Sequence, residues 1–576
     1  MSPVAPRTPV AGWLRNPWVW LGLGLTVVYL RGLFLDLMDV DASQYASISM
    51  EMAQNGQWLQ VHHRHADYLD KPPLLFWTSA ASFLLFGLHN WSYKLPSFMG
   101  ALAGVYAVYR FCRLYYSQET ARHAAFILAA SVGGLLLCND VRTDTLLLGM
   151  TACAVWQLAA YVAPGPQNGN RWGNLLLAGL FTGLAMLAKG PIGLILPLFA
   201  LGVHLLLRRD WKHLFDWRWL IALPVVLLLL FPMCWGLYQQ FDLHPEKVIN
   251  GRSGVSGLYF FFWEQSFGRI TGENVWKNDT SAFYFLHVYL WAFLPWSLLL
   301  VGALWRRIAD LFRQKFYLMQ SDEAFSLGGF VLTFAALSMS KYKLPHYIFI
   351  TLPWAAVLTA RWLGQLSAQG RIRVAGRIQY AVFPVLGAVA FLLLAFVFPT
   401  ADPMLWVVPV LIFGLLAGTA WRQAFPAGAA PLVQRSVLAF LGAAFVLNFH
   451  FYPQLLPYQS TAAAARFALQ HGIPVEKLAF FNRHGHALDF YAGRILPQLE
   501  SPEQVGEAAR SGGDYWLYTD APGRARLDSA GVQYTTTAAF AHFQVALLKP
   551  HFLDPATRSK SLQPVYILKI TGLQKQ

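Results

Sequence analysis

The stretch PWVWLGLGLTVVYLRGLFLDLMDVDASQY, residues 17–45, is an apolar run that ends in two carboxylates, Asp39 and Asp41. Its apolar part, residues 17–37, is about long enough to cross a bilayer as a helix. Carboxylates at a bilayer surface cost free energy unless a cavity, a partner or a substrate uses them. The pair is therefore a candidate functional site. The alternative is a solvated pair that only ends the helix.

The composition extends this interpretation to the whole chain. Of 576 residues, 56% are hydrophobic and 13% are charged, which is typical of a polytopic membrane protein. No small-residue cleavage site follows the first apolar run, so we expect a retained span. The net charge of +15 does not indicate a nucleic acid partner, because no soluble basic domain exists to bind one. We expect the arginines in cytoplasmic loops, beside anionic membrane lipids.

Apolar runs recur along the chain and predict about 13 transmembrane helices. They cover residues 17–37, 95–109, 124–138, 145–162, 174–188, 191–207, 219–237, 283–304, 324–339, 347–360, 380–398, 404–420 and 437–449. A further run, 74–88, is short and could either span the membrane or lie in its interface. The four cysteines fall in or beside these runs and offer neither a disulfide framework nor a CxxC metal site.

Loop charges decide the topology. If 74–88 does not span, the loops richest in arginine and lysine share a side with Arg7 and Arg15; if it spans, they all lie opposite. Because positive charge favours the cytoplasm, we predict that 74–88 lies at the surface and that the N-terminus is cytoplasmic. We further predict a transmembrane domain over 1–452 and a soluble α/β domain over 453–576, outside. Its expected helices are 461–470 and 502–510, and its expected strands are 477–481, 515–518 and 565–570.

The loops that this topology leaves outside carry unusual chemistry. Lys71 precedes two prolines, which hold the backbone extended and could aim its ammonium at a fixed anion. Lys189 lies between two apolar runs, where a cation needs an anion. Arg142 and Asp144 open a span and form a charge pair. Alternatively, Lys71 is a lysine that snorkels to the membrane interface, and Arg142 and Asp144 form a purely structural pair.

Together these residues predict a cavity at the membrane surface with carboxylates and several fixed cations. Lysine and arginine suit a phosphate or pyrophosphate, which they hold by charge-assisted hydrogen bonds. Carboxylates suit a hydroxyl, an amine or a metal. A lipid-linked sugar phosphate would satisfy both.

The order of these motifs resembles a known family. The motifs are the acidic pair, Lys71-Pro72-Pro73, Arg142-Thr143-Asp144, Lys189-Gly190, Trp263-Glu264 with Gly268-Arg269, and Lys341-Tyr342-Lys343-Leu344-Pro345-His346-Tyr347. In this combination, over residues 10–450, the chain resembles polyprenyl-phosphate glycosyltransferases related to protein O-mannosyltransferases. Within them it is similar to the bacterial enzymes that move 4-amino-4-deoxy-L-arabinose from undecaprenyl phosphate to lipid A. The resemblance implies a GT-C fold, an inverting reaction and a periplasmic active site in the inner membrane.

From the motifs and the resemblance we predict three groups of site residues. The catalytic candidates are Asp41, Asp39 and Asp144. The candidates for binding the lipid phosphate are Lys71, Arg142, Lys189, Arg269, Lys341 and Lys343. The candidates for binding the rest of the substrate are Tyr45, Tyr68, Glu264 and Tyr347. The expected partners are the undecaprenyl phosphate-linked sugar, lipid A and membrane lipids, and we expect a monomer.

The chain departs from the family pattern at one point. The family pattern that the resemblance implies for enteric lipid A arabinosyltransferases has Glu-His after the Trp-Glu pair and an acid before the Lys-Pro. This chain keeps the acid as Asp70 but has Gln265-Ser266 in place of Glu-His. No cofactor is assigned from the sequence. The histidines of 62–67 could ligate a divalent ion; the alternative is that they are ordinary surface histidines, because their spacing is not a recognised ligand pattern.

Two other functions compete with the transfer to lipid A. The same enzyme class could act on a protein hydroxyl or another glycan, which would require Asp41 as a general base. A transporter or flippase for a lipid-linked anion would place its charges near the bilayer midplane and often shows inverted repeats. This chain places its charged motifs at one face and shows no repeat, which favours the enzyme.

Overall fold

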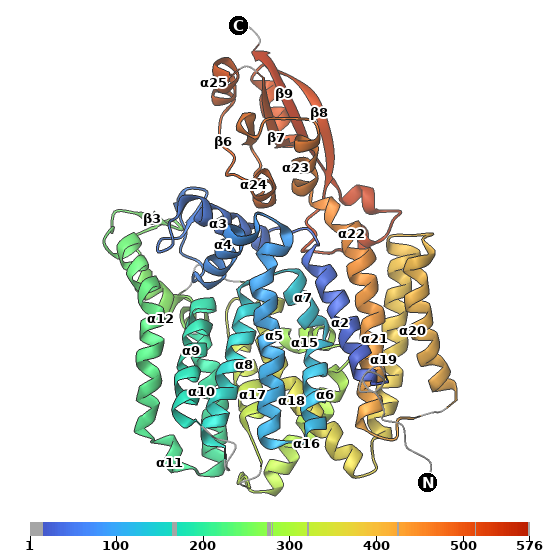
Figure 1. Cartoon of the computed structure of the whole chain (residues 1–576). Coiled ribbons are helices and arrows are strands. Elements are labelled where there is room, and N and C mark those ends of the chain that lie inside the picture. The colour runs from blue at the N-terminus through green and yellow to red at the C-terminus, as the bar shows by residue number, and fades with distance from the viewer. Residues whose placement is uncertain are drawn as a thin grey trace, which may run out of the picture.

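The computed structural model describes residues 15–163, 170–273, 278, 280–319, 322–422, 425–512 and 514–573. A bundle of long helices forms one layer, and a smaller domain made of C-terminal residues lies over one end of it (Figure 1). The chain is mostly helical, as the apolar runs predicted. Its only extended sheet, among the described ranges, lies in the C-terminal domain.

Seven helices of the described residues are long and apolar enough to cross a membrane, and two bent helix pairs raise the number to nine. The seven are α8 (Thr143–Val162), α9 (Arg171–Lys189), Trp211–Asp242 with α12 (Ala222–Leu237), Pro345–Ala368 with α18 (Leu352–Ala368), Arg373–Val397 with α19 (Arg373–Leu392), α20 (Pro403–Trp421) and Ala429–Gln459 with α21 (Ala429–Val446). Four further helices run beside them: α2 (Pro17–Leu33), α5 (Asn90–Tyr115), α10 (Ile192–Arg208) and α17 (Phe325–Ser338).

Two predicted spans are not continuous helices. The run 124–138 is divided between α6 (Gln118–Ala129) and α7 (Val132–Asn139), which meet at 53°, and 283–304 between α15 (Tyr284–Ala292) and α16 (Ser297–Arg313), which meet at 120°. Pro295 interrupts the second pair, because proline lacks an amide hydrogen and clashes within a helix. Ser131 interrupts the first by capping α7.

The two breaks lie against each other. The Val132 amide donates to the Leu294 carbonyl at 3.2 Å, and the Trp296 indole Nε1 donates to the Ala130 carbonyl at 2.7 Å. A non-helical backbone in a membrane is stable only where its polar groups are satisfied inside the protein. Each break therefore supplies the hydrogen bonds that the other one lost.

Burial separates central from peripheral helices. In α8, 94% of the most apolar window is buried, whereas in α20 only 11% is. The close packing of α8 on α5 depends on Gly149, where a Cβ atom would lie 2.0 Å from the Gly100 carbonyl oxygen. Small residues let membrane helices approach in this way. The apolar side chains left exposed on α20 are those expected to face lipid.

The loop that follows α2 forms the surface next to the C-terminal domain. It contains α3 (Asp41–Asn55), the hairpin of β1 (His62–His63) and β2 (Ala66–Asp67), and α4 (Leu74–Phe86). Its helices lie at the end of the bundle that carries the C-terminal domain (Figure 1). At 13 residues, α4 is about 20 Å long, too short to cross the roughly 30 Å hydrocarbon core.

The C-terminal domain contains a five-stranded mixed sheet with the strand order β6-β5-β7-β9-β8. The strands are β5 (Leu478–Phe481), β6 (Gln498–Leu499), β7 (Tyr515–Asp520), β8 (Val532–His542) and β9 (Gln563–Leu573). Strand β5 pairs in parallel with β6 and β7, and β9 pairs antiparallel with β7 and β8. Its longer helices are α23 (Thr461–Gln470), α24 (His486–Ala492), α25 (Pro502–Gly512) and α26 (Ala521–Ser529).

The remaining short elements connect these parts. They are α11 (Trp211–Leu214), β3 (Val248–Ile249), β4 (Arg252–Ser253), α13 (Gly257–Tyr259), α14 (Gly268–Thr271), α22 (Tyr452–Leu455) and α27 (Pro550–Leu553). The segment around α27 touches the bundle itself, because Phe552 packs in one cluster with Val397 and Phe398.

Polar contacts fix the C-terminal domain on the loop after α2. Arg64 of the β1–β2 turn donates to Asp489 of α24, and Arg466 of α23 pairs with Asp36 at 2.9 Å. The Gln459 side chain accepts from the Asp39 amide at 2.7 Å and donates to the Leu37 carbonyl at 2.9 Å. The domain therefore holds the backbone that leads into the acidic pair, from Leu37 to Asp39.

Candidate active site

The outer loops that the charge rule grouped meet at one place in the structure. Asp41 is the first residue of α3, and Arg142 is the N-cap of α8. The Arg142 guanidinium donates to Asp41 Oδ2 at 2.5 Å and lies 2.9 Å from Asp140 Oδ2. Burial opposes ionisation of Arg142, but the Asp140 and Asp41 carboxylates raise its pKa above the ordinary value. Arg142 is thus a permanent cation that fixes Asp41.

A second ion pair lies at the start of α8. The Lys189 ammonium contacts Asp144 Oδ1 at 2.5 Å and lies 3.9 Å from the centre of the Tyr347 ring. His346 lies beside both pairs, with Nε2 3.7 Å from Asp144 and Nδ1 3.3 Å from Arg142. These contacts connect the two ion pairs into one network.

The chain can place Lys189 here because of the residue that follows it. Lys189 ends α9, and the C-cap Gly190 has φ +81° and ψ −157°, a conformation that is essentially restricted to glycine. The turn leads directly into α10. Glycine therefore allows two antiparallel helices to present the lysine at their junction.

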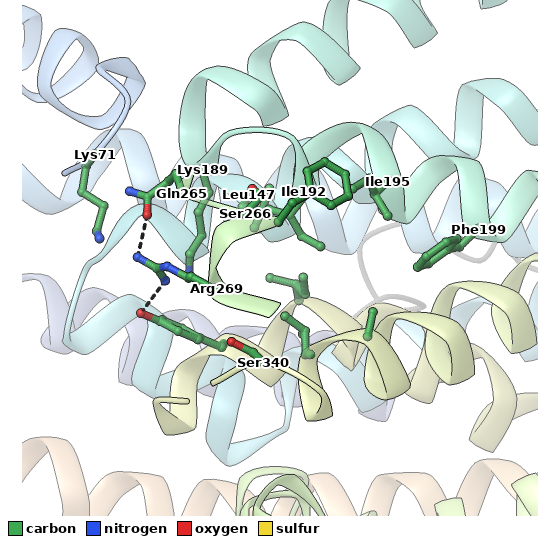
Figure 2. Close-up of a pocket in the computed structure, with 15 residues that line it drawn as sticks. Lys71, Leu147, Lys189, Ile192, Ile195, Phe199, Gln265, Ser266, Arg269 and Ser340 are labelled. Carbon is green, nitrogen blue, oxygen red and sulfur yellow. Dashed lines mark hydrogen bonds between the residues drawn. The ribbon is translucent and has the colours of Figure 1, made fainter. Parts of the chain in front are cut away.

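Arg269 forms the third part of the site (Figure 2). Its guanidinium donates to the Tyr347 hydroxyl at 3.0 Å and to the Gln265 side-chain oxygen at 2.6 Å, while its Nε is buried without a hydrogen-bond partner among the described residues. Gln265 in turn donates to the Asp70 carbonyl, and the Lys341 amide donates to the Arg269 carbonyl at 2.8 Å. Arg269 therefore connects three loops and keeps one donor available.

Lys71 points toward Arg269 at the same end of the cavity (Figure 2). No carboxylate of the described residues lies within 4.0 Å of its ammonium. Burial lowers its pKa to about 8, and the nearby Arg269 adds to this effect. A half-buried lysine that lacks a carboxylate partner and faces an arginine is suited to bind an anion.

The rest of the cavity is apolar. Its lining continues from Lys71, Lys189 and Arg269 along Ile192, Ile195 and Phe199 of α10 (Figure 2). Leu337 of α17 closes the facing side. The cavity therefore has a cationic end and an apolar body, as expected for a phosphate attached to a hydrocarbon chain.

Two predicted tyrosines lie in the wall of the site. Tyr45 is buried on α3, with its ring centre 5.7 Å from that of Phe76. Tyr68 is buried next to it and packs edge-on at 6.0 Å against the same phenylalanine. Both rings therefore pack in the interior against α4, behind the α3 helix that begins at Asp41.

Four predicted residues do not join this group. Asp39 turns toward the C-terminal domain and accepts from Ser43 at 2.5 Å and Thr461 at 3.0 Å. Glu264 pairs with Arg252 at 2.8 Å, and the Lys343 ammonium donates to the Thr280 carbonyl at 3.1 Å. Lys341 has an exposed side chain, and only its backbone contacts Arg269.

The structure adds three residues that were not among the predicted site residues: His346, Gln265 and Asp140. His346 stands inside the Lys-x-Lys-Leu-Pro-x-Tyr motif, directly before the predicted Tyr347, and Asp140 stands two residues before Arg142. Motif membership was the signal available for His346. The guanidinium of Arg142 contacts both Asp140 and Asp41, and the two-residue spacing of Asp140 and Arg142 does not predict this arrangement.

The histidines suggested as metal ligands are dispersed over separate contacts. His62 lies 3.5 Å from Asp67, His65 lies 2.9 Å from Glu51, and His63 faces His486 at 3.2 Å. Within the part of the chain that the structure describes, no group of three or more His, Cys, Asp or Glu side chains is arranged to hold a metal ion.

Comparison with known proteins agrees with this geometry. A family model described as dolichyl-phosphate-mannose-protein mannosyltransferase matches residues 70–235. Crystal structures of ArnT from Cupriavidus metallidurans, bound to undecaprenyl phosphate and in the apo state, superpose with a TM-score of 0.74 each, at 21% and 20% identity over 96% and 97% of this chain and 98% of theirs. The chain has the ArnT fold. The predicted GT-C type of membrane fold is confirmed.

Curated relatives carry a corresponding name. An undecaprenyl phosphate-alpha-4-amino-4-deoxy-L-arabinose arabinosyl transferase from Enterobacter sp. is 26% identical over 65% of this chain, and the match spans 64% of that relative's length. The protein of the same name from Pseudomonas aeruginosa is 27% identical over 74% of this chain and 75% of its own. The resemblance that the motifs indicated is confirmed.

Proposed function

We propose that the chain is an inverting glycosyltransferase that moves 4-amino-4-deoxy-L-arabinose from undecaprenyl phosphate to a phosphate of lipid A. The observation that carries the proposal is the cavity with Lys71, Lys189 and Arg269 at one end and the apolar face of α10 along its body. The named relatives support the choice of sugar and carrier.

The donor phosphate binds at the cationic end. Lys71 lacks a carboxylate partner, and Arg269 keeps its buried Nε available, so both can donate to phosphate oxygens. Lys189 lines the same end of the cavity but is already paired with Asp144, so it is less available as a donor to the phosphate. The polyprenyl chain then extends along Ile192, Ile195 and Phe199, where it replaces contact with membrane lipid.

Asp41 acts on the sugar and the attacking group. An acceptor phosphate oxygen forms a bond to the anomeric carbon while the bond from that carbon to the donor phosphate breaks, and undecaprenyl phosphate leaves as a phosphate monoester. That leaving group is already good, so the site needs alignment and stabilisation of the positive charge on the ring. The Asp41 side chain is 33% exposed, compared with 2% for Asp144, and can reach the substrate.

Arg142 then serves as a positioning residue. Two carboxylates already neutralise it, and its hydrogen bond sets the direction of the Asp41 side chain. Asp144 holds Lys189 in the same way. This assigns the reacting contacts to Asp41, Lys71 and Arg269, with Arg142 and Asp144 supporting them.

We further propose the arrangement in the membrane. The seven long helices, the two bent pairs, the shorter apolar helices α2, α10 and α17, and the 26-residue α5 would give 13 spans in the bacterial inner membrane. The candidate active site and a soluble domain over 453–576 would then face the periplasm, and the enzyme would act as a monomer. The distribution of arginines over the loops supports this orientation.

The deciding experiment is mass spectrometry of lipid A. Cells that carry the gene should contain lipid A that is heavier by the mass of one or two aminoarabinose residues, and cells without it should not. The purified protein, given undecaprenyl phosphate-linked aminoarabinose and lipid A, should produce the same change. Transfer to a protein hydroxyl instead of lipid A would contradict the proposal.

A further inference from the structure

A second polar cavity lies at the junction of the C-terminal domain and the loop after α2. Its volume is about 510 Å³. It is lined by Asp39 and Thr461, by Arg483 and the start of α24 at His486, and by the end of β8 at His542 with the segment that follows, which contains Lys549. None of these residues lines the cavity with Lys71 and Arg269.

The lining of this junction cavity carries two cations, Arg483 and Lys549, against one carboxylate, Asp39, and this balance favours an anion. The Arg483 guanidinium contacts His542 Nε2 at 2.5 Å, and its Nε is buried with no hydrogen-bond partner among the residues described. Burial lowers the pKa of His542 to about 4 and that of His486 to about 2, so both imidazoles are neutral at pH 7. Arg483 and Lys549 are therefore the permanent cations of the lining, and Lys549 is exposed.

The junction cavity is next to the candidate active site along the chain. Asp39 lines the junction cavity, and Asp41, two residues later, accepts from Arg142 in the active site. Two residues of extended chain span at most about 7 Å. The backbone of the junction cavity and that of the candidate active site are therefore within about 7 Å of each other at this point.

One wall of the junction cavity belongs to a segment that reaches the helix bundle. The segment that follows β8 reaches the end of the helix bundle, where Phe552 packs on Val397 and Phe398 (Figure 1). In this segment Leu547 and Leu548 are 57% and 43% exposed, directly before Lys549. Exposed leucines beside a lysine suit an amphiphile with an anionic head group.

We propose that the junction cavity is a second binding site for an anionic saccharide, and that it holds the second phosphate of a bisphosphorylated acceptor while the reacting phosphate lies at Asp41. This inference rests on the proposed function, since it takes the acceptor to be lipid A, a disaccharide lipid with a phosphate at each end. Arg483 and Lys549 bind the second phosphate, and Thr461, Gln544 and Gln563 offer hydrogen bonds to the sugar.

A cycle of two enzymes and two acceptors tests this inference. Full-length wild type and Lys549→Gln are compared on bisphosphorylated lipid A and on monophosphoryl lipid A, whose one phosphate must occupy the active site. Losing one charge-assisted contact should raise KM for the bisphosphorylated acceptor about tenfold. KM for the monophosphoryl acceptor and kcat for both should stay within about twofold.

Two further variants sharpen the comparison. Arg483→Gln should also raise KM for the bisphosphorylated acceptor. Lys549→Gln is the decisive variant, because Lys549 is exposed and its replacement should not disturb folding. Arg510→Gln is the matched control. It removes an exposed cation on α25, at the far end of the same domain, and should leave both KM values unchanged (Figure 1).

Each other outcome has a distinct meaning. Equal KM increases for the two acceptors, or no increase for either, would overturn the second site and leave the transferase intact. No transfer by wild type to either lipid would overturn the proposed function together with this inference. Free glucosamine 1-phosphate tests whether the site takes the acceptor head group or a separate soluble ligand. It should compete with the bisphosphorylated acceptor in wild type. A change of kcat in place of competition would overturn the assignment.

Discussion

Replacement of Asp41 by asparagine tests the centre of the proposed mechanism. The change keeps the size of the side chain and an oxygen that can accept from Arg142, but it removes the charge. Breaking a buried ion pair usually costs about 3–5 kcal/mol because it leaves one charge uncompensated. Here Asp140 remains 2.9 Å from Arg142, so we expect a loss of stability of only about 1 kcal/mol.

The effect on transfer should be much larger. Removing one preorganised electrostatic group lowers kcat by about two to three orders of magnitude, or about 2.7–4 kcal/mol in the barrier. Rates of aminoarabinose transfer by the purified variant measure this loss, and binding of undecaprenyl phosphate should stay near the wild-type affinity, because Asp41 does not line that cavity.

The matched control is Asp36→Asn. Asp36 lies on the same loop and pairs with Arg466, which is 45% exposed, so its loss should cost at most about 1 kcal/mol of stability and little activity. A rate of Asp41→Asn within about threefold of wild type would refute the role of Asp41. A large drop in its melting temperature would instead identify Asp41 as a structural residue.

Three other measurements follow from the structure. Because the pKa of Lys71 is lowered to about 8, affinity for undecaprenyl phosphate should fall as the pH rises through about 8; Lys71→Arg should abolish this fall, and the same fall in Lys71→Arg would contradict the assignment. Gly190→Ala should destabilise the protein by about 1–3 kcal/mol, because φ is +81°, whereas Gly202→Ala, where a Cβ meets open space, should not; equal melting temperatures would refute the strain. A reporter active only outside the cytoplasm should be active after Pro453 and silent after Arg209 or Arg373, and the reverse pattern would invert the topology.

The sequence predicted which loops meet better than which side chains meet. Loop charges and short motifs place Asp41, Arg142, Lys189 and Arg269 on one face, because these signals depend on residues close together in the chain. The direction of a side chain depends on distant partners. Asp39 faces Thr461, 422 positions away, and no pattern near Asp39 indicates that contact.

Some details of the fold could not be predicted from the sequence, because they also depend on distant partners. The breaks at Ser131 and Pro295 lie in apolar runs of ordinary length, and hydropathy does not distinguish a bent pair from a straight span. Strand β8 was not predicted because its threonines and alanines give no clear alternation, and it lies at the edge of the sheet, where one side needs no apolar face.

The contact between the two broken spans sets an order for assembly in the membrane. The carbonyl of Ala130 can form its hydrogen bond only after the indole of Trp296 has been synthesised, 166 residues later. The Val132 amide likewise has no partner until Leu294 has been synthesised. Until then each group either lacks a hydrogen bond in the hydrocarbon, which costs several kcal/mol of free energy, or forms one with water or with the insertion machinery. The first third of the chain therefore cannot complete its folding alone, and a version of the protein split between α12 and α15 should become stable only when both fragments are made together.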